Sequence, residues 1–397
     1  MKKIYLLMIV LFKAGYEFKK PEKKKILIFD YVGGTAFFYK YFTDNTCPIL
    51  YVRGEKINLY VVLTILIKFK IPSLKEYIKE YIKFVKPKYI FHNSYNRRFF
   101  EIDKKDYDFE ITRIFTQAEK KNHLSFYEFV ANKKNLNCDY LFVESKSVKR
   151  HMQKYVSGNY IVHGLFKNNV APKINLDKLQ NKLIFISQYR TFKKNKNETI
   201  DTVSEKLWGM KYSYKQFYQA DATVAKLLKE FCEKKNIKFQ IVGTSLIDKE
   251  GEKLFYEKVL GKKNWEYLEA FPNMRGVHLT PNAKYIATID STLGYECFAR
   301  GQRVSFFSIR SKYLKTEYSV FGWPQALPNE GECWTLKNEE EDFRRLTNFL
   351  FKGTDSQWDI LRNQTLKDIV FYDFKNIKYK NFLKEINLYQ DEKKDQE

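Results

Sequence analysis

A short polar stretch late in the chain has the residue types and spacing of an anion-binding site. Asp290, Ser291 and Thr292 directly follow an apolar run at 285–289, which is typical of a buried strand. Any of the three can cap a helix, and residues 293–300 continue with helical spacing. The N-terminus of a helix binds anions because its first N–H groups are unpaired and its dipole is positive there. The stretch therefore predicts an anion site where a strand meets a helix.

The residues that follow this stretch complete a βαβ unit. Gly301 is placed just past the expected helix end, and 304–309 is a second apolar run. Open α/β sheets bind ligands outside the carboxyl ends of their strands, which is where 290–292 would lie. Glu296 comes four residues after Thr292, so both side chains would share one face of the helix.

Alternating strands and helices extend this pattern over most of the chain. Strands are expected at 26–29, 49–52, 89–91, 113–115, 140–144, 160–163, 183–186 and 239–242, and helices at 74–85, 217–234 and 340–351. Such alternation predicts parallel sheets covered by helices on both faces. We expect an α/β protein with two Rossmann-like domains facing each other across a cleft. Its expected parts are an accessory segment at 1–24, an N-terminal domain at 25–175, a C-terminal domain at 180–378 and a charged tail at 379–397.

The composition indicates a folded protein and leaves its partners open. The chain has 397 residues, 17% of them aromatic, and a formal net charge of +24. A charge of this size makes nucleic acid, anionic lipid and phosphorylated substrates candidate partners. Abundant Lys, Asn, Ile, Phe and Tyr would also follow from an AT-rich genome. The five cysteines are far apart and include no C-x-x-C pair, so we expect reduced thiols and no metal.

Three features of the N-terminal half have more than one interpretation. Gly33 and Gly34 follow the first expected strand, and they serve either a tight turn or the close approach of a ligand; the full G-x-G-x-x-G fingerprint is absent. The nearly all-apolar run 59–69 is either a buried helix or a basic, apolar helix at a membrane surface. The apolar run 4–12 after Lys2 and Lys3 is too short to span a bilayer, and no cleavage site for a signal peptide follows it. It is either an extension that touches a membrane, a first strand, or the product of an upstream start codon outside the domain.

Seven motifs give the chain a family resemblance over about residues 25–378. These motifs are residues 51–58, Gly164 with 166–169, 186–190, 289–296, 299–301, 321–324, and Gly331 with Trp334. With them the chain resembles surface-carbohydrate or O-antigen biosynthesis proteins related to glycosyltransferases of the GT-B architecture, which has two Rossmann-like domains. The resemblance implies a transferase that moves a sugar from a nucleotide-activated donor to a growing surface polysaccharide or glycolipid, such as O-antigen, lipopolysaccharide or capsule.

The resemblance also implies a donor site in the C-terminal domain. Ser291 and Thr292 would hold the donor phosphate, and Glu296 would accept hydrogen bonds from ribose or sugar hydroxyls. Asp290 would either cap the helix or act as an orienting residue in the site. The other residues expected on the donor side are Gln188, Arg190, Gly243 and Arg310, the two arginines as cations that neutralise the leaving phosphate. The resemblance implies no cofactor and no metal.

The catalytic base is less clear than the donor site. Inverting transfer needs a carboxylate or a histidine near the acceptor hydroxyl. The resemblance leads us to expect an Asp-Asn pair after Phe91, but this chain has His92 and then Asn93 there. His92 and Asp30 are therefore the candidate catalytic residues, with Gly33, Gly34 and Arg53 on the acceptor side.

Other functions fit parts of the same pattern. A nucleotide-sugar epimerase and a glycerophosphotransferase using a CDP-activated donor share the two-domain layout. A non-catalytic scaffold or a basic nucleic-acid-binding protein would explain the charge, although no nucleic-acid motif is present and none is expected as a specific partner. We expect a cytoplasmic protein, with peripheral contact to an anionic membrane surface as a further partner.

Overall fold

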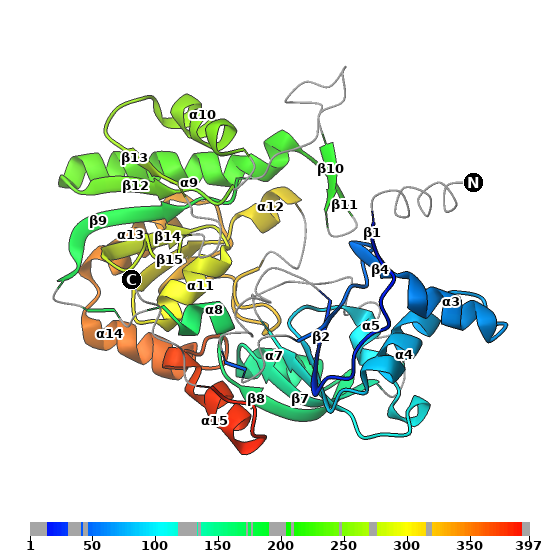
Figure 1. Cartoon of the computed structure of the whole chain (residues 1–397). Coiled ribbons are helices and arrows are strands. Elements are labelled where there is room, and N and C mark those ends of the chain that lie inside the picture. Colours follow the sequence, from blue (N-terminus) through cyan, green and yellow to red (C-terminus); the bar gives the residue numbers. More distant parts are fainter. Residues whose placement is uncertain are drawn as a thin grey trace.

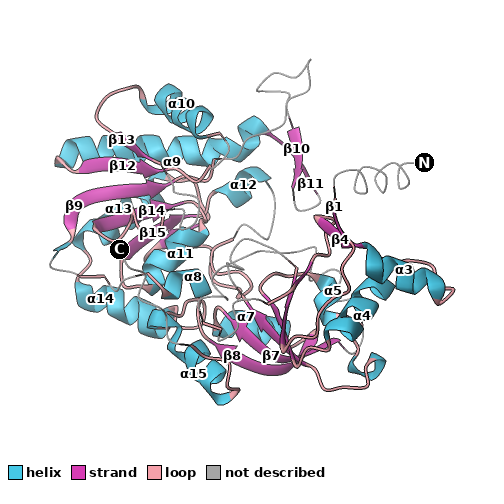
Figure 2. Cartoon of the chain, in the orientation of Figure 1, coloured by secondary structure: helices cyan, strands magenta, loops and turns pink. Residues whose placement is uncertain are grey.

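Two separate parallel sheets form the framework of the computed structural model (Figures 1 and 2). The structure describes residues 14–30, 41–42, 47–117, 133, 136–171, 174–175, 178–189, 204–207, 210–245, 248–269, 276–314 and 320–390. The two sheets lie within the two ranges predicted for the domains. The mixed α/β class predicted from the alternation is therefore confirmed.

The N-terminal sheet has six parallel strands in the order β3-β2-β5-β6-β7-β8. They are β2 (Ile26–Phe29), β3 (Ile49–Leu50), β5 (Tyr89–His92), β6 (Thr112–Thr116), β7 (Leu136–Val143) and β8 (Val156–Val162). Successive side chains of β2 pack into different clusters, Leu27 and Phe29 on one face and Ile26 and Ile28 on the other. A strand buried on both faces must be apolar at every position, which explains its unbroken apolar run. The helices of this part are α3 (Leu59–Ile67), α4 (Leu74–Val85), α5 (Arg97–Phe100), α7 (Lys146–Met152) and α8 (Phe166–Asn169).

The C-terminal sheet also has six parallel strands, in the order β13-β12-β9-β14-β15-β16. They are β9 (Gln180–Ile186), β12 (Lys238–Val242), β13 (Glu266–Leu268), β14 (Ala283–Thr288), β15 (Arg303–Phe307) and β16 (Trp334–Thr335). Its helices are α9 (Tyr214–Lys235), α10 (Lys249–Leu260), α11 (Thr292–Ala299), α12 (Arg310–Leu314), α13 (Glu340–Lys352) and α14 (Asp355–Ile360). An antiparallel hairpin of β10 (Ser204–Leu207) and β11 (Met210–Ser213) precedes α9. Short turns of 3₁₀ or π helix lie at Lys104–Asp106, Leu361–Thr365 and Phe374–Asn376.

Each sheet has one topological switch point, where the chain stops adding strands on one side and begins to add them on the other. In the C-terminal sheet the chain runs from β9 outward to β12 and β13, and then returns to build β14, β15 and β16 on the other side. In the N-terminal sheet it runs from β2 to β3 and then returns to β5. Loops on the two sides of such a switch point diverge and leave room for a ligand beyond the carboxyl ends of the strands. The two switch points are therefore where the fold can bind ligands.

Residues near both ends of the chain join the N-terminal part. Helix α15 (Ile377–Glu385) buries Tyr379, Phe382 and Leu383 in the cluster on one face of the N-terminal sheet. The prediction of a charged tail at 379–397 is therefore wrong for 379–390, while 391–397 lie outside the described residues. Within the expected accessory segment, β1 (Gly15–Glu17) pairs in parallel with β4 (Lys56–Asn58).

Helix α3 differs from the buried helix that we considered for 59–69. Only Val61 and Ile65 of its nine residues are buried, and several of its large apolar side chains are exposed. The interpretation as a buried helix is wrong, because α3 packs one narrow side against its neighbours. Within the described residues, no helix is both long enough and apolar enough to cross a membrane.

Candidate functional site

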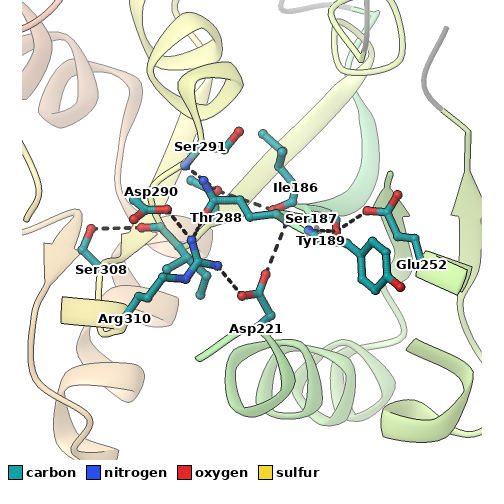
Figure 3. Close-up of polar contacts among 12 residues, drawn as sticks. Ile186, Ser187, Tyr189, Asp221, Glu252, Thr288, Asp290, Ser291, Ser308 and Arg310 are labelled. Carbon is teal, nitrogen blue, oxygen red and sulfur yellow. Dashed lines mark hydrogen bonds and ion pairs between the residues drawn. The ribbon is translucent and has the colours of Figure 1, made fainter. Parts of the chain in front are cut away.

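Helix α11 begins at the switch point of the C-terminal sheet. Ser291 is its N-cap, and the Ser291 hydroxyl accepts a hydrogen bond from the Leu293 amide at 3.3 Å. The Ser291 amide donates to Thr288 Oγ1 at 3.2 Å, which holds the strand-to-helix turn in place (Figure 3). Thr292 is the first helical residue and Glu296 lies one turn further along, nearly buried. This arrangement presents the positive end of a helix dipole beside a hydroxyl-bearing residue.

A buried arginine ties the loops on both sides of this switch point together (Figure 3). Arg310 is 2% exposed, and its Nη1 donates to Asp290 Oδ1 at 2.9 Å and to Gln188 Oε1. Its Nη2 pairs with Asp221 of α9, which also accepts a hydrogen bond from the Gln188 amide. The planar guanidinium lies over the ring of Phe217 at 4.4 Å. Arg310 thus holds the ends of β9 and β14 in one geometry.

The charges in this network offset one another. Burial raises the pKa of Asp290, although the adjacent Arg310 opposes the rise. Burial also disfavours the charged form of Arg310, but the carboxylates of Asp221 and Asp290 outweigh it and raise the pKa of Arg310. Because both terminal nitrogens of Arg310 already serve protein acceptors, its observed contacts are those of a positioning residue. Arg310, which we predicted to neutralise the leaving phosphate, is therefore engaged by acceptors of the protein itself in this structure.

The loop after β12 is organised by a buried glutamate. Glu252 accepts hydrogen bonds from the amides of Thr244 and Ser245 and from the hydroxyls of Ser187 and Tyr267. Its pKa is raised, chiefly by burial, and these four donors oppose the rise.

Gly243, predicted on the donor side, lies beneath this loop. A Cβ atom at Gly243 would come within 2.1 Å of the Tyr267 hydroxyl and 2.9 Å of a Glu252 carboxylate oxygen. The side chains around it leave no room for a larger residue, so the glycine is explained by packing.

Asp30 occupies the switch point of the N-terminal sheet. It follows β2, is fully buried and has a φ of 68°, a left-handed conformation that is uncommon outside glycine. Its Oδ2 accepts hydrogen bonds from Arg53 Nε at 2.8 Å and Asn96 Nδ2 at 3.0 Å. Its Oδ1 has no hydrogen-bond partner among the described residues. Strained, incompletely satisfied carboxylates of this kind occur at functional sites.

Arg53 connects Asp30 to the loop on the other side of the switch point. Its Nη2 donates to the Ser94 hydroxyl at 3.3 Å, and about half of its side-chain surface is exposed. It therefore lies at the edge of the site, as expected for a residue on the acceptor side.

His92 has the contacts of a structural histidine. Its Nδ1 lies 2.8 Å from the Phe29 carbonyl, and its Nε2 accepts a hydrogen bond from the Asn96 amide at 3.2 Å. These contacts assign the neutral tautomer with the proton on Nδ1. Complete burial lowers the pKa of His92 to about 4. Because protein backbone groups engage both nitrogens of the imidazole, its contacts are those of a structural residue, and the role of His92 as the base stays a prediction.

Three other predicted residues, Gly33, Gly34 and Arg190, lie outside the described residues. In the part of the chain that is described, no group of three or more His, Cys, Asp or Glu side chains could hold a metal ion.

Asn168 joins α11 to the N-terminal part, a role that sequence reasoning missed. Its Nδ2 donates to the Glu296 carbonyl at 3.3 Å, and its Oδ1 accepts from Arg300 Nη1 at 3.0 Å. Asp221 was missed as well. Asp221 lies among the apolar residues on the inner face of a helix, and this position could have indicated a buried ion pair, since a carboxylate there needs a buried partner.

Comparison with known proteins identifies the class of molecule. A model of an O-antigen biosynthesis protein family matches residues 117–387. Among curated proteins, none matches. A crystal structure assigned as a UDP-N-acetylglucosamine 2-epimerase from Listeria monocytogenes is similar at a TM-score of 0.50 and 11% identity, covering 92% of this chain and 96% of that one.

Two further solved structures resemble the chain slightly less. The UDP-GlcNAc 2-epimerase from Neisseria meningitidis bound to UDP-GlcNAc gives a TM-score of 0.48 at 11% identity, covering 91% of this chain and 100% of that one. The wall teichoic acid polymerase TagF gives 0.46 at 10% identity, covering 93% and 89%. At 11% identity the Listeria structure concerns the fold alone, and it agrees with two Rossmann-like domains of the GT-B type.

Proposed function

We propose, starting from the fact that this chain belongs to the O-antigen biosynthesis protein family, that it is a glycosyltransferase. The donor would be a nucleotide-activated sugar, and the acceptor a growing surface saccharide or its lipid-linked precursor. One observation supports this most directly: the two switch points carry complementary groups. The C-terminal one presents a helix N-terminus suited to phosphate, and the N-terminal one holds a buried carboxylate oxygen without a partner among the described residues.

The donor phosphates would bind at the start of α11. Ser291 and Thr292 would hydrogen-bond the phosphate oxygens, and Glu296 would accept hydrogen bonds from donor hydroxyls. Arg310 offsets only part of the negative charge of Asp290, because it also pairs with Asp221. The helix terminus supplies positive potential at the leaving group, so we expect transfer to proceed without a metal ion.

Asp30 would act as the general base. Its Oδ1 would take the proton of an acceptor hydroxyl while Arg53 and Asn96 hold the other carboxylate oxygen. The acceptor oxygen then bonds to the anomeric carbon as the bond from that carbon to the donor phosphate oxygen breaks. The nucleotide leaves with the electron pair and with its charge at α11.

The environment of the cysteines fits a cytoplasmic enzyme. All five lie among the described residues, are buried and form no disulfide. We therefore place the reaction in the cytoplasm.

A binding experiment tests the donor site. Thermal shift with CMP-, UDP- and GDP-sugars and with CDP-glycerol should show stabilisation by one class of nucleotide sugar. The shift should be lost in Glu296→Ala and in Ser291→Gly combined with Thr292→Ala. Glycine is chosen at position 291 because it caps helices almost as well as serine. Ser213→Gly, at the N-cap of α9, is the matched control and should respond as wild type.

A transfer assay then tests the base. Asp30→Asn keeps the shape of the side chain and tolerates the left-handed backbone, so the protein should fold and bind donor. Transfer should fall about a hundredfold or more. Asp106→Asn, at an ion pair with Lys79 in the same sheet region, should leave transfer unchanged. No response to any nucleotide sugar would refute the proposal, and epimerisation of the donor without an acceptor would replace it with the epimerase alternative.

A further inference from the structure

Helix α3 and the loop after it carry a concentration of exposed apolar side chains. Phe69 is 100% exposed, Ile71 86% and Ile67 75%, and Leu63 and Leu66 are about half exposed. In Figure 1 this segment forms the edge of the molecule furthest from the C-terminal sheet. Soluble proteins rarely expose large apolar side chains in one contiguous group without a partner for them.

The residues of α3 are almost all apolar, although the helix lies at the surface. A surface helix of a globular protein normally carries polar residues on its outer side. Here the outer side carries leucine and isoleucine, and only Thr64 breaks the run from Leu59 to Ile67. A helix that is apolar on all sides fits a place where its outer side also contacts an apolar environment.

The conformation of Phe69 adds an independent observation. The Phe69 amide donates to the Leu66 carbonyl at 2.9 Å, and the Lys70 amide donates to the Ile65 carbonyl at 3.1 Å. These two bonds form a Schellman motif, in which Phe69 takes the left-handed position that glycine normally occupies. Its φ is 55°, which is unfavourable for a bulky side chain. Fully exposed, the ring offers no packing within the chain to offset this strain, so an external partner is the simplest reason for it.

The charge around the exposed group identifies the kind of partner. Residues 56–88 contain eight lysines and two glutamates. Three acidic residues from outside this range, Glu17, Asp106 and Asp108, pair with three of these lysines, so the whole group keeps a net charge of +3. Lys68 and Lys70 flank Phe69, and both keep about half of their side-chain surface exposed while pairing with Glu80 and Glu76. Lysines around an apolar helix are typical of segments that lie in the interface of an anionic bilayer.

We infer that α3 and the loop to α4, residues 59–73, form a membrane-docking surface that inserts Phe69 and Ile71 into the interface of an anionic bilayer. The segment lies outside the region that the family model matches. Exposed Tyr16 and Phe18 adjoin it, because β1 pairs with the strand that leads into α3. Docking would bring the N-terminal sheet close to the lipid surface.

Vesicle binding by the full-length protein tests this inference and needs no nucleotide donor. Co-sedimentation with phosphatidylcholine vesicles should be weak, and it should strengthen with added phosphatidylglycerol and weaken with added salt. Phe69→Gly should reduce binding about tenfold or more, while Tm stays unchanged or rises because glycine relieves the left-handed strain. Ile71→Glu should also lose binding. Ile360→Glu, at an exposed isoleucine on α14, is the matched control and should bind as wild type.

Several results would overturn the inference. The wild-type protein could fail to bind anionic vesicles, or it could bind equally with and without phosphatidylglycerol. The third such result is a Phe69→Gly variant that binds vesicles as well as wild type does. Light scattering that shows a wild-type dimer dissociated by Ile71→Glu would instead assign the surface to a second copy of the chain.

Discussion

Replacing Arg310 by methionine tests whether this residue acts within the protein or on the ligand. The guanidinium is almost fully buried between Asp221, which is completely buried, and Asp290. Methionine fills much of the same space but leaves the Asp221 carboxylate without its charged partner. Breaking a buried pair in this way costs about 3–5 kcal/mol of unfolding free energy. Adding Asp221→Asn to Arg310→Met should recover a large part of this loss, since the uncompensated charge is then gone.

Urea unfolding followed by tryptophan fluorescence measures this effect where it occurs. Trp265, Trp334 and Trp358 pack in the hydrophobic cluster of the C-terminal sheet, so their signal reports on that part of the chain. Arg303→Met is the matched control, because Arg303 pairs with the exposed Asp355 and should contribute about 1 kcal/mol or less. The reasoning is refuted if Arg310→Met unfolds within about 1 kcal/mol of wild type and yet loses its response to nucleotide sugars. That result would make Arg310 a ligand-binding residue.

Two further predictions concern stability. Burial lowers the pKa of both His92 and His163 from 6.5 to about 4, so in this pH window the unfolded chain binds more protons than the native one. The unfolding free energy should therefore fall as pH falls from 6.5 to 4, by about 3 kcal/mol for each histidine. The urea midpoint of His163→Gln should depend less steeply on pH than the midpoint of wild type. An equal pH dependence of the two midpoints would contradict this prediction. Gly243→Ala should lower the unfolding free energy by about 1–3 kcal/mol because its methyl group would overlap the Tyr267 hydroxyl. Tyr267→Phe should restore part of this loss, and a Gly243→Ala variant as stable as wild type would show that the loop has room.

The sequence predicted the parallel sheets well because buried strands have a distinctive pattern. Strands covered on both faces, such as Ile26–Phe29, need apolar residues at every position, and such runs are visible without any knowledge of the fold. The cap of α11 was also predictable, because serine before an apolar helical segment is a local signal.

Features that depend on distant contacts were not predictable in this way. Local sequence does not reveal that Asp221 meets Arg310, 89 residues later in the chain. Nor does it distinguish His92 from Asp30 as a base, since only the fold shows that backbone groups occupy both nitrogens of the imidazole. The apolar run at 59–69 has the same pattern whether its outer side meets protein or lipid, so the choice between the two needed the observed exposure.

The position of α15 has a consequence for how the protein folds during synthesis. This helix covers Tyr140 and Phe142 of the N-terminal sheet, although it is made about 240 residues after them. Every strand of the C-terminal sheet is synthesised before α15, so that sheet can be completed while the first sheet still has an uncovered apolar face. Domains usually complete folding in the order in which the ribosome makes them. In this chain the order of completion would be reversed, and the growing polypeptide would need protection from aggregation until its last helix emerges.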